Sequence, residues 1–234
     1  MTRVLLLHAL PFDGRMWDAV AERLRAAGHE AAAPDLPPDG GGATLAGWAD
    51  RLLAAEEEPF VAAGSSLGGY LALELWRRAP ERIVGLALVG SRAADDSPEV
   101  KESRDGTIAF LREHGVEELW PGLAPRLLAP GAPPEVVERA HEIALAQEPE
   151  RLIAALAAMR DRADARPLLP GITVPVLVVR GELDAVVPLE EAKAVAAAVP
   201  DGELVRLDGT GHLPPLEWPE ELARRLLRFL EDVP

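Results

Sequence analysis

Short apolar runs alternate along most of the chain with segments whose apolar residues recur at helical spacing. The runs predict buried strands at residues 3–7, 30–33, 59–63, 83–89, 174–179 and 203–207. The periodic segments predict helices at residues 15–27, 44–55, 70–79, 189–199 and 218–230. Strands that alternate with helices in this way predict an α/β fold: a doubly wound, mostly parallel six-stranded sheet.

The alternation stops between residues 92 and 166, where no strand pattern is present. Ser97 and Pro98 begin a helix there, since serine is a good N-cap and proline is tolerated in the first turn. Three or four further short helices are expected, divided by prolines at positions 121, 125, 130, 133, 134 and 149. Because the sheet resumes afterwards, residues 92–166 are predicted to be an inserted helical cap on a core formed by residues 1–91 and 167–234.

Composition narrows the classes of function. Of 234 residues, 48% are hydrophobic, which is enough for a globular domain. The net charge of −15 argues against nucleic acid and anionic membranes as partners, because both would repel the chain. With no cysteine there are no disulfides or thiolate metal sites. No apolar stretch reaches membrane-spanning length, and the apolar run at the N-terminus is too short for a signal peptide. A cytoplasmic location is therefore expected. The composition does not indicate the oligomeric state.

A glycine-rich turn between residues 59–63 and the following helix has the form G-x-S-x-G, with Ser66 at its centre. In this setting a serine sits on a tight turn with its hydroxyl projecting from the sheet. The turn leaves no room for side chains two positions before and after the serine, and Gly64 and Gly68 meet that requirement. Such a turn also occurs by chance. A phosphate-binding loop would need a lysine after the glycines, and none follows. Ser66 is therefore a candidate nucleophile.

A serine nucleophile needs a base, usually histidine, and the chain has five histidines. His212 lies in a glycine-flanked loop after the last predicted strand, away from any helix face, and is the predicted base. His8 follows the first strand and is expected to brace the turn there. Surface roles are expected for the remaining three, at positions 29, 114 and 141.

The histidine in turn needs a carboxylate, for which Asp184 is the main candidate. It follows the predicted strand at 174–179 by one tight turn, although a helix-capping role would also fit. Asp95 or Asp96, after the strand at 83–89, is the alternative, in a region where charges are ordinarily solvated. The order Ser66, Asp184, His212 is that of α/β-hydrolases, and all three should lie at the carboxyl edge of one sheet.

Four stretches carry a resemblance to a known family: HALPFDGRMWD, GSSLGGYLALELWRRAPERI, VPVLVVRGELDAVVP and GTGHLPPLEWPE. Together they resemble α/β-hydrolases of the small bacterial esterase and enol-lactonase type. The resemblance implies an oxyanion hole formed by the backbone N–H groups of Leu10 and Leu67. The family usually has His-Gly where this chain has His8 and Ala9, which puts the shape of that loop in question. Glu217 resembles a residue that fixes the histidine loop, although it could equally be an acidic residue at a helix start.

The expected function is that of a serine hydrolase that cleaves a small carboxylic ester without a metal or organic cofactor. The same residues would also serve an enol-lactonase, a thioesterase or a C–C bond hydrolase. A protein of another class, a receptor that binds a small ligand and turns it over slowly, is the further alternative. Eight apolar residues are candidates to line the cap and favour uncharged esters: Ile108, Leu111, Leu119, Trp120, Leu127, Leu128, Leu156 and Met159. Arg104, Arg112 or Arg126 could instead bind a substrate carboxylate.

Overall fold

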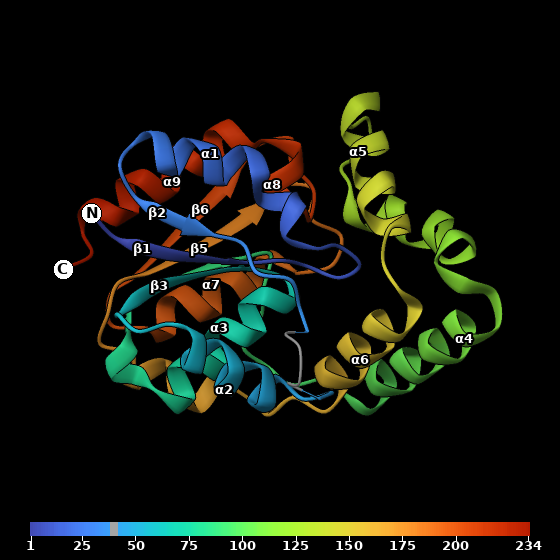
Figure 1. The fold of residues 1–234 in the computed structure, drawn as a ribbon, viewed down its shortest axis with the longest axis horizontal. Helices are drawn as coiled ribbons and strands as arrows, with labels where there is room; N and C mark the ends of the chain where they lie inside the picture. Colours follow the sequence, from blue (N-terminus) through green and yellow to red (C-terminus); the bar gives the residue numbers. More distant parts are fainter. Residues whose placement is uncertain (38–41) are drawn as a thin grey trace.

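The computed structural model, which describes residues 1–37 and 42–234, is built around one six-stranded sheet (Figure 1). Every neighbouring pair of strands in it is parallel. The strands are β1 (Arg3–Leu7), β2 (Glu30–Ala32), β3 (Phe60–Ser65), β4 (Ile83–Val89), β5 (Val176–Gly181) and β6 (Gly202–Leu207). Each strand predicted from the apolar runs is present, and the predicted parallel sheet is confirmed. Part of the Pro/Gly-rich stretch between β2 and the next helix, residues 38–41, lies outside the described residues.

The order of the strands determines where a ligand can bind. The sheet runs β2-β1-β3-β4-β5-β6, so the chain moves from β1 to one edge and then returns to the other side of β1. In doubly wound sheets the loops diverge at this reversal and leave a crevice beyond the carboxyl ends of the strands. Leu10 follows β1 and Ser66 follows β3, so the two residues lie on either side of that crevice.

Helices cover both faces of the sheet (Figure 1). One face carries α1 (Asp18–Ala26), α8 (Pro214–Glu217) and α9 (Pro219–Glu231); the other carries α2 (Leu45–Ala55), α3 (Leu67–Arg78) and α7 (Leu189–Ala198). Side chains of β1 alternate between the two resulting cores, with Leu5 and Leu7 in one and Val4 and Leu6 in the other. A strand buried on both faces must be apolar throughout, which explains the continuous runs in the sequence. Three short 3-10 helices, Gly14–Trp17, Pro80–Arg82 and Arg166–Gly171, complete the connections.

Three helices are inserted between β4 and β5: α4 (Pro98–Leu127), α5 (Pro134–Leu145) and α6 (Pro149–Arg160). Ser97 caps α4 as predicted, its hydroxyl accepting a hydrogen bond from the N–H of Val100. The prediction that prolines 121 and 125 divide helices is wrong, because both lie inside α4. The interruption is at Gly115, whose φ is 79°. Proline removes one donor but keeps a helical φ, whereas a residue with positive φ leaves the helical backbone altogether.

The inserted helices extend beyond the carboxyl ends of the strands (Figure 1). Their buried side chains join the two cores instead of forming a third: Ile108 and Leu156 belong to the core that contains α3, and Trp120 to the core that contains α1. Trp120 meets Phe12 edge-on, with ring centroids 6.3 Å apart. These contacts hold the inserted helices over the crevice. The division into a core and a cap at residues 92 and 166 stays a prediction.

Candidate active site

Ser66 occupies the turn between β3 and α3. Its φ of 50° and ψ of −110° make it the one non-glycine residue with positive φ in the described part of the chain. Such a conformation costs of order 1–3 kcal/mol and persists only where the surroundings enforce it. Here the N–H of Ser66 donates to the Val89 carbonyl (2.8 Å), and the Ser91 hydroxyl donates to the Ser66 carbonyl (2.8 Å). The strained turn keeps the Ser66 side chain half-exposed at the crevice.

The glycines two positions before and after Ser66 are required by close approach of backbone to backbone. A Cβ at Gly64 would lie 2.1 Å from the carbonyl carbon of Gly68, and a Cβ at Gly68 would lie 2.0 Å from the Leu7 oxygen. Real Cβ atoms do not approach other atoms this closely, so no other residue fits without moving β1 or β3. The requirement for two residues without bulk, predicted from the motif, is confirmed.

His212 and Asp184 form a buried pair. The Nδ1 atom of His212 lies 2.9 Å and 3.0 Å from the two carboxylate oxygens of Asp184, and the side chains are 2% and 0% exposed. Burial alone would raise the pKa of Asp184, but the hydrogen bonds from His212 and from the N–H groups of Val186 and Val187 hold it below the ordinary value. The charged carboxylate therefore fixes the tautomer in which Nδ1 carries the proton and Nε2 is free to accept one.

Glu217 holds the loop that carries His212. Its carboxylate accepts hydrogen bonds from the N–H groups of Ala129 (2.8 Å), Gly211 (2.9 Å) and Leu213 (3.0 Å). Glu217 is also the acidic residue in the first turn of the four-residue helix α8, so the helix-start alternative fits its position as well. The N–H of His212 itself donates to the Leu127 carbonyl at the end of α4 (2.9 Å). The position of the histidine is thus tied to the inserted helices as well as to the sheet.

Ser66, His212 and Leu10 line one cavity of about 220 Å³ beneath the inserted helices. Asp184 lies behind the histidine. Of the eight apolar residues expected to line the cap, Leu127, Leu156 and Met159 reach this cavity. The others serve the packing of the helices, since Ile108, Leu111, Trp120 and Leu128 are buried in the two cores and Leu119 packs against one of them.

Arginine side chains, which the sequence offered only as an alternative, form part of the same wall. Arg92, Arg104 and Arg126 line the cavity, and Arg112 does not. Arg104 pairs with the Asp96 carboxylate, while Arg92 donates to the Val186 carbonyl (2.8 Å) and lies 3.4 Å from Glu191. Arg126 is exposed and makes no ion pair with any described residue. The wall therefore presents an uncompensated positive charge in a protein of net charge −15.

The alternative acids, Asp95 and Asp96, are paired with arginines, although Asp96 lines the same cavity as Ser66. Asp96 is 1% exposed and bonded by Arg104 and by Arg162, whose Nη1 is 2.8 Å from its carboxylate. Burial raises the pKa of Asp96, and the two arginines more than offset this and lower it. The expectation that charges at this boundary are solvated is wrong for Asp96, because its partners come from residues far along the chain. Asp95 is exposed, 3.8 Å from Arg166. Neither carboxylate is bonded to His212.

His8 braces the loop after β1, as predicted. It is 2% exposed, its Nε2 accepts a hydrogen bond from the N–H of Leu36 (2.7 Å), and its Nδ1 lies 3.0 Å from the Ala9 carbonyl. Burial lowers the pKa of His8. The folded protein consequently keeps this ring neutral at a pH at which a solvated histidine gains a proton.

A loss of stability in mild acid follows from this pKa. His8 gains a proton near pH ~6.5 in the unfolded chain and only at lower pH in the folded chain. Its contribution to the free energy of unfolding is therefore complete above about pH 6.5 and declines below it. As the pH is lowered below about 6.5, we expect the unfolding free energy of the wild type to fall relative to that of His8→Gln. The slope of this difference should approach about 1.4 kcal/mol per pH unit. Urea unfolding of both proteins between about pH 8 and 5 measures this. A difference that stays constant with pH would contradict the assignment.

Two further properties of the described residues bear on the kind of site. Within residues 1–37 and 42–234, no group of three or more His, Cys, Asp or Glu side chains is arranged to hold a metal ion. In the same ranges no helix is both long enough and apolar enough to cross a membrane.

A doubly wound parallel sheet with a strained serine turn at its carboxyl edge is the architecture of the α/β-hydrolase class of enzymes. The model of the alpha/beta hydrolase family matches residues 4–225. The chain belongs to this family.

Relatives of known name fit this assignment. The chain is 33% identical to a pimeloyl-[acyl-carrier protein] methyl ester esterase of Aromatoleum aromaticum, over 94% of each chain. It is similar in structure to a thermophilic esterase from Thermogutta terrifontis solved with malate bound, with a TM-score of 0.93, 34% identity and coverage of 99% of this chain and 90% of that one. An enol-lactonase from Burkholderia xenovorans shares the fold, with a TM-score of 0.82, 24% identity and coverage of 99% and 92%.

Proposed function

We propose that the protein is a serine hydrolase that cleaves a small carboxylic ester through Ser66, His212 and Asp184. The observation that carries the proposal is the buried hydrogen bond between His212 and Asp184, at 2.9 Å, in a histidine that shares a cavity with the strained Ser66. The names of the two relatives above 30% identity support it, because both are esterases. Only one of the two names specifies a substrate, so the proposal is limited to the ester bond that both names have in common.

The first half of the reaction forms an acyl-enzyme. The Ser66 Oγ attacks the ester carbonyl carbon while His212 Nε2 takes its proton, and the charged Asp184 stabilises the imidazolium that results. The N–H groups of Leu10 and Leu67 would donate to the developing oxyanion, each worth about 3 kcal/mol. Neither N–H donates to another described group, and that of Leu67 lies at the N-terminus of α3, where the helix dipole favours negative charge.

The second half releases the acid. When the carbonyl re-forms, the bond to the alcohol oxygen breaks and His212 gives its proton to that oxygen. Water then attacks the acyl-enzyme, His212 takes the water proton, and the Ser66 oxygen leaves with that proton as the carboxylic acid departs. No step requires a metal or an organic cofactor. Residues 92–166 would act as a cap that closes the cavity from above, since Leu127, Leu156 and Met159 line it.

Burst kinetics test this proposal against a slowly reacting receptor. With excess 4-nitrophenyl acetate, we expect an enzyme to release nitrophenol repeatedly, at a steady rate that exceeds one equivalent within seconds. A receptor would release about one equivalent and then stop, because its acyl-enzyme persists. The absence of both a burst and steady turnover on acyl esters, lactones and thioesters would refute the proposal.

A second candidate, an esterase or lactonase for substrates that carry a carboxylate, is favoured by one observation. Arg126 is exposed at the wall of the cavity and has no ionic partner among the described residues. An arginine in this position can bind a carboxylate through two parallel hydrogen bonds. The earlier expectation of a preference for uncharged esters rested on an apolar lining, and the lining contains arginines as well as apolar residues.

Replacement of Arg126 by glutamine separates the two candidates. We expect Arg126→Gln to lower kcat/KM for the 4-nitrophenyl half-ester of succinic acid by about tenfold, because a charge-assisted hydrogen bond is lost. The value for neutral 4-nitrophenyl butyrate should stay unchanged, and added salt should reduce the difference. Arg112→Gln is the matched control, since Arg112 does not line the cavity. An equal loss on both esters, or a loss in the control, would contradict a carboxylate site at Arg126.

A further inference from the structure

A charged side chain lies inside the buried strand that leads to Asp184. All six residues of β5 are buried, among them Arg180, which is 8% exposed. A buried cation is costly unless hydrogen bonds satisfy it. The carboxylates nearest to it along the chain pair elsewhere, Glu182 with Arg206 and Asp184 with His212. Other acceptors must therefore satisfy Arg180.

Those acceptors belong to the segment that carries Asp184, residues 181–187, here called the acid loop. The guanidinium of Arg180 donates to backbone carbonyls of this loop only, those of Gly181 (2.6 Å), Glu182 (3.0 Å), Asp184 (2.9 Å) and Val187 (2.9 Å). Because these carbonyls lie before, at and after Asp184 in the sequence, one planar group holds the backbone on both sides of the acid.

The side chain of Asp184 completes this arrangement. Its Oδ1 accepts hydrogen bonds from the N–H groups of Val186 (2.7 Å) and Val187 (3.0 Å). With its backbone held by Arg180 and its carboxylate held by these N–H groups, Asp184 keeps one orientation, in which it meets His212. A group that acts on a reacting partner loses much of its effect when it is displaced by as little as about 1 Å.

The acid loop also lies directly against the loop that carries His212. The N–H of Leu183 donates to the Thr210 carbonyl (2.8 Å). A Cβ at Gly181 would lie 1.9 Å from the Gly211 oxygen, so the two backbones are in close contact. The bond between the acid and the histidine therefore depends on the backbone shape of the acid loop.

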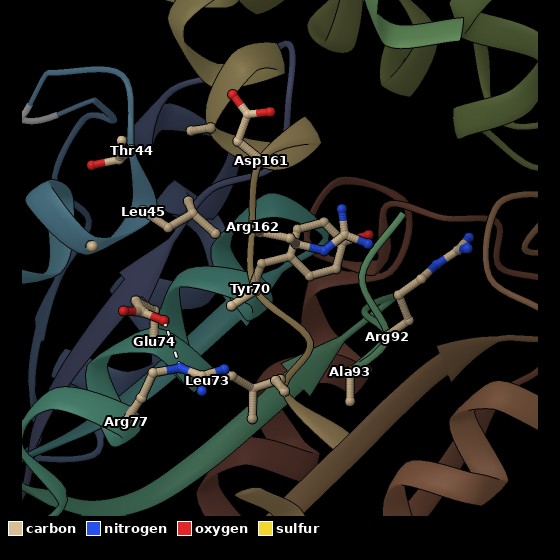
Figure 2. A pocket seen from close by; sticks show the side chains of 14 residues that line it. Thr44, Leu45, Tyr70, Leu73, Glu74, Arg77, Arg92, Ala93, Asp161 and Arg162 are labelled. Carbon is tan, nitrogen blue, oxygen red and sulfur yellow. Dashed lines mark hydrogen bonds and ion pairs between the residues drawn. The ribbon is translucent and has the colours of Figure 1, made fainter. Parts of the chain in front are cut away.

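A second arginine contacts the acid loop from the chain after β4. The Nη2 of Arg92 donates to the Val186 carbonyl (2.8 Å), and Figure 2 shows this side chain directed away from Glu74. Arg92 also lines the cavity of about 220 Å³, so its replacement would alter the binding of substrate as well. Arg180 is buried and is not part of the described lining of that cavity, which makes it the better subject for a test.

We propose that Arg180 is a positioning residue whose hydrogen bonds to the acid loop hold the Asp184 carboxylate against Nδ1 of His212. The inference rests on the proposed function, in which Asp184 stabilises the imidazolium form of His212. Arginine suits this task because its planar guanidinium offers donors in several fixed directions, whereas the ammonium of lysine offers them from a single point.

Replacement of Arg180 by methionine and by lysine tests the proposal. Arg206 is the matched control, because it lies beside Arg180 in the register of β5 and β6 but is exposed; it receives the same two replacements. For each protein, kcat and KM are measured on 4-nitrophenyl acetate, and circular dichroism checks folding. Proton NMR observes the His212 Nδ1 proton, whose bond to a carboxylate moves its resonance far downfield. The absence of this resonance in Asp184→Asn assigns it.

We expect Arg180→Met to lower kcat about a hundredfold and Arg180→Lys to lower it about tenfold. KM should stay unchanged, because the displaced acid weakens support for the transition state and leaves the substrate cavity as it is. The downfield resonance should disappear in Arg180→Met and shift in Arg180→Lys. Both variants of Arg206 should keep the wild-type rate and the wild-type resonance.

A wild-type kcat with an unchanged resonance in folded Arg180→Met, or equal losses in the Arg206 variants, would overturn the positioning role. If Arg180→Met does not fold, Arg180→Lys decides in the same way. An Arg180→Lys variant that does not fold would also overturn the role, because Arg180 would then serve the fold as a whole. A wild type that cleaves no ester would overturn the proposed function, and the resonance alone would then decide whether Arg180 positions Asp184.

Discussion

Replacement of Ser66 by alanine is expected to lower kcat on a short ester by about a millionfold. The small rate that remains would come from substrate binding alone. The hydroxyl is the only group removed, and alanine can occupy the same turn because the backbone is held by the hydrogen bonds from Ser66 to Val89 and from Ser91 to Ser66. A fluorophosphonate probe followed by mass spectrometry should label Ser66 in the wild type and nothing in the variant. Circular dichroism should show the same secondary structure in both.

Ser65→Ala is the matched control for this experiment. Its hydroxyl is buried and has no hydrogen-bond partner among the described residues, so its removal should leave both activity and labelling unchanged. Labelling that moves to Ser65 or Ser91, or that persists in Ser66→Ala, would show that Ser66 is not the nucleophile.

The second large effect is expected from Asp184→Asn, with a fall in kcat of about ten-thousandfold. Asparagine keeps the shape of the side chain, but its amide no longer favours the tautomer of His212 in which Nε2 accepts a proton. Because the pKa of Asp184 is lowered in the folded protein, the carboxylate is charged over the whole range in which a histidine titrates. The measurement is kcat for the wild type and the variant over that range, with CD to check folding.

Asp96→Asn and Asp95→Asn are the controls, since both carboxylates follow β4 and were alternatives for the acid. Asp96→Asn should destabilise the protein, because Arg104 and Arg162 lose a charged partner, but the folded variant should retain most of its activity. A near-normal rate in Asp184→Asn together with a large loss in one of the controls would assign the acid to the loop after β4.

The sequence by itself determined those features that depend on residues close together in the chain. Apolar runs specify strands buried on both faces, helical spacing specifies the covering helices, and a glycine two positions either side of Ser66 specifies the tight turn. The order of strands and helices then brings the residues after β1, β3, β5 and β6 to one edge of the sheet. This is why Ser66, Asp184, His212 and Leu10 could be assigned to a common edge before any distance was known.

Only the tertiary structure decided features that depend on contacts between distant segments. The burial of Asp96 requires Arg162 and Arg104, and the role of Glu217 requires the backbone of Ala129, 88 positions away. The break of α4 at Gly115 was likewise found only in the structure, since the prolines at positions 121 and 125 had been expected to divide helices and lie inside one. Cavities are the extreme case. Leu111 fills a core and Arg126 lines the site because of the surfaces that meet where the inserted helices cover the sheet. The spacing of residues along the chain does not indicate which surfaces will meet.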